Sequence, residues 1–245
     1  MTKIAVIGGT GMNQWPGLEI KSKKSFKTPY GAPSAPLLSG EIAGVRVAFL
    51  ARHGEGHKLP PHRINYRANL WMLKQAGIQS VIAIAAVGGI ARQLPPAAVA
   101  IPDDLIDYTY SRDHTYSDGD GASVQHVEVT DPYAPALRST LLRSAKRAKI
   151  KIMDGGVMGV TQGPRLETPA EIARMKRDGC DMVGMTGMPE AALARELGLD
   201  YACLALSVNW AAGIGQGDIH AEIERTVAEG MRKIRAILSE ALPAI

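Results

Sequence analysis

The feature that most constrains the fold of this chain is the segment Ser80–Val87 (SVIAIAAV), which is apolar at every position after the serine. A strand covered on one face alternates apolar and polar side chains, so an unbroken apolar run is typical of a central strand buried on both faces. Similar runs at Lys3–Ile7 and Tyr201–Val208 alternate along the chain with amphipathic stretches at Ala134–Ala148 and about Ile219–Leu242. This alternation predicts an α/β fold with a mostly parallel or mixed sheet.

Composition limits the classes of partner. The 245 residues carry 28 Lys+Arg against 24 Asp+Glu, a net charge of +4 that is too small for binding nucleic acid by phosphate neutralisation. No stretch approaches the roughly 18 apolar residues of a membrane span, and we expect neither a signal peptide nor an anchor. Cys180 and Cys203 lie far apart without metal-ligand spacing, so we expect a cytoplasmic protein without a metal site. Because no linker or repeat divides residues 1–245, we predict one domain.

Glycine, proline and polar residues mark the remaining elements. Gly8–Gly11 follows the first strand and predicts a tight turn of the size that holds a phosphate. Thr168-Pro169-x-Glu171 is typical of a helix start, with a threonine N-cap and proline at the first position. Further predictions are a hairpin of Ala35–Leu38 and Val45–Leu50, a helix from about Asn65 to Gly77, a long loop over Asp103–Pro132, one strand over Ile152–Val160, and a helix opened by Gly184–Glu190.

The predicted strand ends carry an unusual set of polar groups. Ligands of open α/β sheets bind at the carboxyl ends of the strands. Hydroxyls, a guanidinium, an imidazole and backbone amides together favour binding of a dianion such as phosphate. The residues concerned are Thr10, Arg52, His53, Ala86 with Gly88, Glu167, Met185-Thr186 and Asn209.

Each of these residues also has an ordinary structural interpretation. The glycines at Gly8–Gly11 do not form GxGxxG, so a dinucleotide-binding enzyme is disfavoured and a simple turn remains open. Arg52 has the commoner alternative of a surface ion pair, and His53 that of a structural histidine. Glu167 is also explained by the preference of acids for helix N-termini, and Asn209 by capping of a turn. Only their joint placement favours a site.

Seven motifs occur in the order seen in one known family, which the chain resembles over essentially its whole length. They are GGTGM, ARHG, HRINYRANLWMLK, AAVGGI, TQGPRLET, GMTGMPEAALARELGL and SVNW, and they are similar to those of the trimeric purine nucleoside phosphorylase and methylthioadenosine phosphorylase family. The resemblance implies a homotrimeric α/β fold around a mixed, barrel-like sheet. It implies cleavage of purine nucleosides by inorganic phosphate, without a metal or organic cofactor, and with no nucleic-acid or membrane partner.

The resemblance also implies roles for individual residues. Thr10, Arg52, His53 and Thr186 match phosphate ligands, assisted by the backbone near Ala86. Ala85 departs from the family, whose members often carry Thr or Asn there. Several positions match residues that contact the nucleoside: Met185 beneath the ribose, Asn209 at the N7 edge of the purine, Trp210 and Ala211 beside Asn209, Glu167 and Ile223. His126 matches a residue that enters the site of the neighbouring subunit. The expected catalytic pair is Asn209 and His53.

Two of these positions predict the choice of purine. Methylthioadenosine phosphorylases that resemble this chain carry aspartates where Asn209 and Ala211 stand. An amide at Asn209 can donate to a 6-oxo oxygen and accept from N7–H. Glu167 matches a glutamate that accepts N1–H in 6-oxopurine phosphorylases, and adenine has no hydrogen there. Such a mismatch lowers kcat/KM for the wrong substrate by up to about 10⁴–10⁵-fold. Hypoxanthine is therefore the expected base.

The sugar end resembles the methylthio branch of the family. A histidine that binds the 5′-hydroxyl in the inosine branch matches Ile223, one turn before Val227, so an apolar 5′ pocket is expected. His220 is three residues away, and a small shift of alignment places a hydroxyl binder there instead. The combined prediction is phosphorolysis of S-methyl-5′-thioinosine to hypoxanthine and 5-methylthioribose 1-phosphate. Alternatives are methylthioadenosine or inosine/guanosine phosphorolysis, and a nucleoside-binding regulatory protein.

Overall fold

The computed structural model describes residues 3–9, 17–42, 44–119, 124–216 and 219–245. Eleven strands of this part of the chain form one mixed sheet. They are β1 (Ile4–Gly8), β2 (Glu19–Lys24), β3 (Leu37–Ile42), β4 (Val45–Ala51), β5 (Ser80–Gly89), β6 (Val99–Ile101), β7 (Asp104–Asp107), β8 (Ile152–Asp154), β9 (Val157–Val160), β10 (Cys180–Gly184) and β11 (Asp200–Trp210). The helices are α1 (Tyr66–Gln75), α2 (Pro135–Arg147), α3 (Pro169–Arg177), α4 (Gly187–Glu196) and α5 (Ile219–Ala241).

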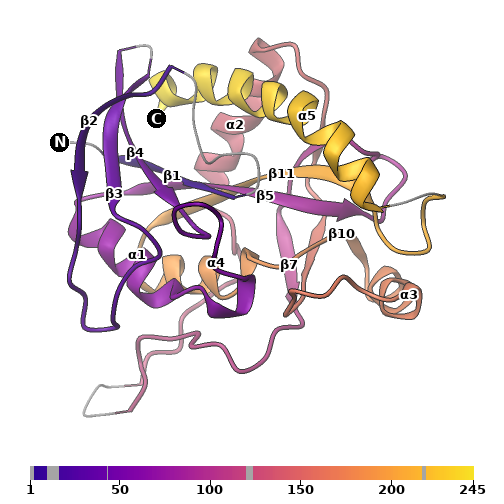
Figure 1. Cartoon of the computed structure of the whole chain (residues 1–245), viewed down its shortest axis with the longest axis horizontal. Coiled ribbons are helices and arrows are strands. Elements are labelled where there is room, and N and C mark those ends of the chain that lie inside the picture. Colours follow the sequence, from indigo (N-terminus) through magenta and orange to yellow (C-terminus); the bar gives the residue numbers. More distant parts are fainter. Residues whose placement is uncertain (1–2, 10–16, 43, 120–123, 217–218) are drawn as a thin grey trace.

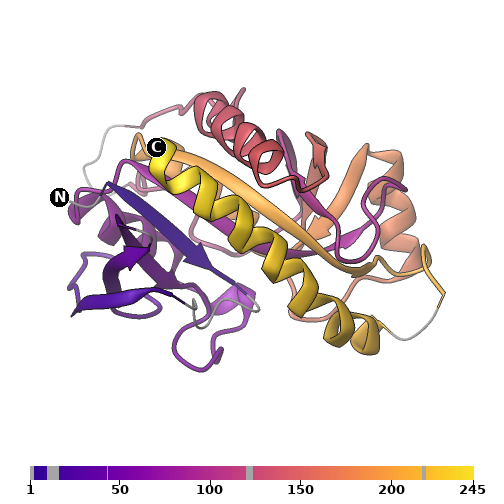
Figure 2. The same cartoon turned by 90° about the horizontal axis from the view of Figure 1, so that it is seen from above.

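The centre of the sheet is buried on both faces, as the apolar run in β5 predicts. Successive side chains of a strand point to opposite faces, and in β5 Val81 and Ala83 enter one core while Ile82 and Ile84 enter another. Helices α1 and α4 supply the first core, and α2 and α5 the second (Figures 1 and 2). The predicted α/β class is confirmed.

The sheet forks along one edge of β5. Strand β1 pairs in parallel with the first half of β5, up to the pair Ile7–Ala83, and β10 pairs antiparallel with its end, at Gly88–Val183. On this edge neither β1 nor β10 pairs with the residues between Ala83 and Gly88. The other edge pairs with β11 over the full length of β5. The fork leaves backbone groups of β5 available beside the strand ends.

Several local predictions are confirmed. The hairpin is the antiparallel pair of β3 and β4. Asn65 caps α1 by accepting from Ala68 N at 3.0 Å. Thr168 and Glu171 form a capping box at the start of α3, each accepting from the other's backbone N–H.

Other local predictions are wrong in detail. The single strand expected over Ile152–Val160 is divided into β8 and β9, because Gly155 and Gly156 take φ of 83° and 99°. Strand β8 then pairs with β6, whereas β9 pairs with β7 and β10. The loop expected over Asp103–Pro132 begins with strand β7. Strands this short carry too little periodicity to be recognised from sequence.

A search of the described helices for one with the length and hydropathy needed to cross a membrane finds none.

Candidate active site

A cavity of about 630 Å³ lies at the fork of the sheet and is lined by seven separate segments of the chain. Its described lining consists of Gly9, Arg52, His53, His57, Lys58, Leu59, Pro60, Pro61, Ala85, Ala86, Val87, Gly88, Pro164, Leu166, Glu167, Val183, Gly184, Met185, Thr186, Val208, Asn209, Ala211, Ala212, Ile219 and Ile223. Its size is within the range of small-molecule sites, and its walls are mainly apolar with a few convergent polar groups.

The cavity brings together most of the residues singled out from the sequence. Those that line it are Arg52, His53, Ala86, Glu167, Met185, Thr186, Asn209, Ala211 and Ile223. Trp210 is not among the lining residues, and its side chain lies against Gly215. His126 is exposed on a segment away from the cavity. Thr10 lies outside the described residues.

Arg52 is held rigidly at the end of β4. Its Nε and Nη2 donate to the two carboxylate oxygens of Glu190, each at 2.7 Å, and its Nη1 donates to Ile84 O at 2.8 Å. Burial lowers the pKa of Arg52, but the carboxylate of Glu190 outweighs this and raises it overall. A side chain at Gly9 would lie 3.0 Å from Nη1, which accounts for glycine there. Arg52 therefore faces the cavity as half of an ion pair in which its Glu190 partner is 0% exposed.

His53 follows Arg52 and is a neutral imidazole. Its Nδ1 lies 2.8 Å from Leu59 O. Because a carbonyl only accepts, the hydrogen is on Nδ1 and Nε2 keeps its lone pair. Burial and the charge of Arg52 lower the pKa of His53 to about 4. His53 thus offers an acceptor, and a hydrogen phosphate ion has an O–H group that can donate to it.

The backbone of β5 supplies a donor at the fork. The N–H and C=O of one strand residue point to the same edge, and residues two apart share that edge. Since Ile84 O faces Arg52, Ala86 directs its N–H toward the same gap. Thr186 lies across it at the start of α4, where its hydroxyl makes no capping bond to the helix. These groups suit the recognition of an oxyanion.

The opposite end of the cavity presents hydrogen-bonding groups of defined polarity. Thr161 Oγ1 donates to Glu167 Oε1 at 2.6 Å, which leaves Oε2 as an acceptor. Asn209 Nδ2 donates to Trp210 O at 2.7 Å, so one amide N–H and the carbonyl oxygen remain. Val208 and Asn209 both reach the cavity because a bulge in β11 separates Ser207 from Asn209 in register.

Helix α5 closes the cavity with apolar side chains. Ile219 and Ile223 both line it, as expected for residues four apart on one helix face. His220 is exposed and is not among the lining residues. Of the two alternatives left open by the sequence, the structure therefore places Ile223 at the wall.

Two basic residues of the lining were missed. His57 stacks on His53, with ring centroids 4.2 Å apart and an interplanar angle of 21°. Burial lowers the pKa of His57 as well. Lys58 follows at the mouth of the cavity. The spacing of the two histidines in ARHGEGHK is the only sequence signal that could have indicated them.

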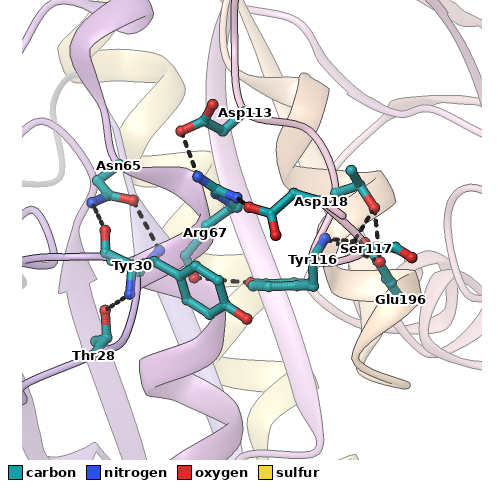
Figure 3. A network of polar contacts seen from close by, with 11 residues as sticks. Thr28, Tyr30, Asn65, Arg67, Asp113, Tyr116, Ser117, Asp118 and Glu196 are labelled. Carbon is teal, nitrogen blue, oxygen red and sulfur yellow. Dashed lines mark hydrogen bonds and ion pairs between the residues drawn. The ribbon is translucent and has the colours of Figure 1, made fainter. Parts of the chain in front are cut away.

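The polar segment after β7 is anchored to α1 and α4. Arg67 on α1 forms ion pairs with Asp113 and Asp118, and Tyr116 OH donates to Arg67 O at 2.8 Å (Figure 3). Tyr116 N donates to Glu196 on α4. This segment has no further helix or strand among its described residues, and these hydrogen bonds and ion pairs hold it against α1 and α4.

Comparison with known proteins agrees with this architecture. The sequence matches the family described as "Phosphorylase superfamily" over residues 3–243. A protein of Xanthomonas campestris named "Probable S-methyl-5'-thioinosine phosphorylase" is 53% identical over 99% of this chain and 94% of its own length. A protein of the same name from Pseudomonas syringae is 52% identical over 100% of both chains.

A solved structure shows the same arrangement in space. It is a methylthioadenosine phosphorylase from an Antarctic soil metagenomic library, with 35% identity and a TM-score of 0.92 over 100% of this chain and 86% of that chain. The sheet, the cavity at its fork and the full-length match lead to one conclusion: the chain belongs to the phosphorylase superfamily.

Proposed function

We propose that this protein cleaves S-methyl-5′-thioinosine with inorganic phosphate, releasing hypoxanthine and 5-methylthioribose 1-phosphate. The observation that carries the proposal is that one cavity joins Asn209 and Glu167 to the apolar side chains Ile219 and Ile223. A 6-oxopurine suits the first pair, and a methylthio group suits the second. Two relatives more than half identical to the chain carry the corresponding name.

The polar groups support a 6-oxopurine. With Oε1 of Glu167 accepting from Thr161, Oε2 is free to accept N1–H of hypoxanthine. The N1 atom of adenine is itself an acceptor, so adenine would leave a buried lone pair facing another. The remaining N–H of Asn209 can donate to the 6-oxo oxygen. Hydrogen phosphate loses its proton when it becomes the sugar phosphate ester, the departing base gains one at N7 from solvent, and the Asn209 carbonyl can accept that N7–H.

The phosphate end supports direct attack without an enzyme nucleophile. Phosphate held by Arg52, His53, Thr186 and the Ala86 backbone, with Thr10 as a further ligand, would lie beside C1′ of a ribose on Met185. As the glycosidic bond breaks, positive charge develops on the sugar and the phosphate stabilises it. A neutral His53 accepts the O–H of hydrogen phosphate, so the unprotonated oxygens face the sugar. Hydrogen bonding of Asn209 at the N7 edge disperses the negative charge that develops on the departing purine.

The site is proposed to be completed by a neighbouring copy in a homotrimer. His126 lies on an exposed segment with Val124 and Val129, which are 74% and 44% exposed. Apolar side chains so exposed are explained if a second subunit covers them. The chain is proposed to act as a single domain in the cytoplasm, which its two free, buried cysteines fit.

The test is a comparison of kcat/KM for S-methyl-5′-thioinosine, S-methyl-5′-thioadenosine and inosine, each with phosphate. We expect the first substrate to lead both others. A preference for methylthioadenosine would contradict the roles of Asn209 and Glu167. A preference for inosine would contradict the apolar 5′ wall.

A second candidate is methylthioadenosine phosphorolysis. The solved methylthioadenosine phosphorylase that matches this chain shares its fold at 35% identity. Nucleoside binding without release of free base would instead indicate a nucleoside-binding protein, so release of free base must be measured with and without phosphate.

A further inference from the structure

We propose that Arg112 is a positioning residue that holds the phosphate-binding and base-binding segments of the cavity at a fixed separation. The inference rests on the proposed function, because it assigns those two segments their ligands. Arg112 lies behind the cavity on the polar segment after β7 and is not itself part of the lining.

One side of the Arg112 guanidinium holds the segment that carries Met185 and Thr186. Its Nη1 donates to Met185 O at 2.9 Å and to Met188 O at 2.6 Å. These two carbonyls lie on either side of Thr186, at the turn from β10 into α4. The backbone that presents the Thr186 hydroxyl is therefore fixed from behind.

The other side holds the segment that leads to Glu167. Nη2 donates to Thr161 O at 3.2 Å and to Gln162 O at 2.8 Å, and Nε donates to Gln162 Oε1 at 3.0 Å. Thr161 in turn donates to Glu167 Oε1 through its hydroxyl. A displacement of Arg112 would move the backbone from which Glu167 is oriented.

The two segments held by Arg112 also contact each other directly. Gly163, with a φ of 59°, lies so close to Met185 that an added Cβ would be 2.5 Å from its sulfur. The planar guanidinium directs its donors in a fixed geometry, which a flexible ammonium does not reproduce. The ends of β9 and β10 are joined by Thr161 N, which donates to Gly184 O at 2.8 Å, and Arg112 connects the two segments beyond that point.

Charge also distinguishes Arg112 from the other buried arginine. Arg52 is neutralised by Glu190, whereas the hydrogen bonds of Arg112 to the described residues end on backbone carbonyl, amide and hydroxyl oxygens, which are uncharged. Burial lowers the pKa of Arg112, whose side chain is 8% exposed, and Tyr66 and the charge of Asp107 offset this lowering only in part. Burying a cation without an adjacent counter-ion is costly, and here the surrounding carbonyl, amide and hydroxyl oxygens offset that cost by accepting its hydrogen bonds.

The experiment compares Arg112→Gln and Arg112→Lys with the wild type in phosphate-dependent cleavage of S-methyl-5′-thioinosine. We expect Arg112→Gln to raise KM for phosphate and KM for the nucleoside, each by about tenfold or more, equivalent to 1.4 kcal/mol per tenfold. Arg112→Lys keeps the charge and some of the donors, so it should recover part of both losses. A role in folding alone predicts a lower Tm with both KM values unchanged.

Arg138→Gln is the matched control. Arg138 also donates to two backbone carbonyls, Ile101 O at 2.9 Å and Pro102 O at 2.8 Å, but it lies outside the cavity. Its loss should lower Tm and leave both KM values unchanged.

Three outcomes overturn the inference: unchanged KM values in Arg112→Gln, a rise in KM for phosphate alone, or an equal rise in Arg138→Gln. If Arg112→Gln does not fold, unchanged KM values in Arg112→Lys overturn it as well. Failure of the proposed function is separate, because it would appear as absent phosphate-dependent cleavage in the wild type.

Discussion

At the scale of single residues, the cavity depends on side chains whose own partners restrict what they can bind. The carboxylate of Glu190 and the hydroxyl of Tyr201 surround Arg52 from behind, with Tyr201 OH donating to Glu190 Oε1 at 2.8 Å. His53 has its hydrogen directed to Leu59 and Glu167 has one oxygen occupied by Thr161. Arg52 can therefore only donate a hydrogen bond to a ligand, and His53 Nε2 and Glu167 Oε2 can only accept one, which is how a polar site discriminates between similar substrates.

In the proposed site, Asn209 is the residue that we expect to set the choice of purine most directly. We expect Asn209→Asp to raise activity toward 6-aminopurine nucleosides relative to 6-oxopurine nucleosides by about tenfold or more, because a carboxyl group can accept from the 6-amino group. The measurement is the ratio of kcat/KM for S-methyl-5′-thioadenosine and S-methyl-5′-thioinosine. Asn65→Asp, which keeps the helix cap outside the cavity, should leave the ratio unchanged. If the ratio in Asn209→Asp also stays constant, another residue selects the base.

His53 makes stability depend on pH on the acid side. Its pKa is lowered to about 4 in the folded protein, against about 6.5 in an unfolded chain. Between these values the unfolded state binds more protons, so the free energy of unfolding falls as pH falls from about 6.5 and is unaffected above it. We expect that lowering the pH from 7.5 to 5 reduces the free energy of unfolding of the wild type by about 1–2 kcal/mol more than that of His53→Gln. The measurement is urea denaturation in phosphate-free buffer. The exposed control His114→Gln should behave like the wild type, and equal losses in all three proteins would refute the prediction.

At the scale of elements, two irregularities of the sheet bring polar groups to the cavity, one of them side chains and the other backbone groups. The bulge in β11 lets adjacent residues Val208 and Asn209 face the same side. The fork along β5 exposes backbone groups between β1 and β10. Helix α5 is regular, and its spacing alone places Ile219 and Ile223 on one wall. The first two features arise from pairing between strands, and the third from a single helix.

Ile223 tests the contribution of α5 to the choice of sugar. We expect Ile223→Ser to lower the ratio of kcat/KM for S-methyl-5′-thioinosine over inosine by roughly 10-fold or more, because an apolar contact with the methylthio group is lost and a hydroxyl partner gained. Glu224→Ser on the exposed side of the same helix is the control and should keep the ratio. An unchanged ratio in Ile223→Ser would place the 5′ group elsewhere in the cavity.

At the scale of the whole molecule, one sheet joins strands from both ends of the described chain. Strand β1 and strand β11 pair with opposite edges of β5, which carries residues 80–89. The two cores pack on the two faces of the sheet and hold this arrangement, and the cavity lies at the fork beside the strand ends. The proposed trimer extends the site beyond one chain through His126.

Shared sites in a trimer predict complementation between inactive variants. The variant His126→Ala has an intact cavity but lacks the histidine proposed to enter the neighbouring subunit's cavity. The variant Glu167→Gln has an altered cavity but retains that histidine. Both variants alone should lose most activity toward S-methyl-5′-thioinosine. Subunits unfolded together and refolded as a 1:1 mixture should recover about a quarter of the wild-type sites, because a competent site needs an intact cavity beside an intact neighbour. Activity equal to the average of the two separate variants would show that each site lies within one subunit.

Sequence patterns predicted those parts of the structure that depend on neighbours along the chain. The central strand follows from the apolar run at Ser80–Val87 and the cap of α3 from Thr168-Pro169-x-Glu171. For α5 the sequence indicated Ile223 with Val227, but the structure places Ile219 beside Ile223 in the cavity wall and Val227 outside it. Motifs likewise indicated Arg52, His53, Thr186, Glu167 and Asn209 as one site, and all of them line the cavity.

Only the tertiary structure decided what those groups have as partners. The ion pair of Arg52 joins residues 138 positions apart in sequence, and no local pattern indicates it. Arg112 stands in a polar segment whose sequence gives no sign of burial, yet it clasps two segments more than 45 residues away. Periodicity and capping act over a few residues, whereas the charge, tautomer and free hydrogen-bonding groups of a buried side chain are set by atoms that folding brings together from distant parts of the chain.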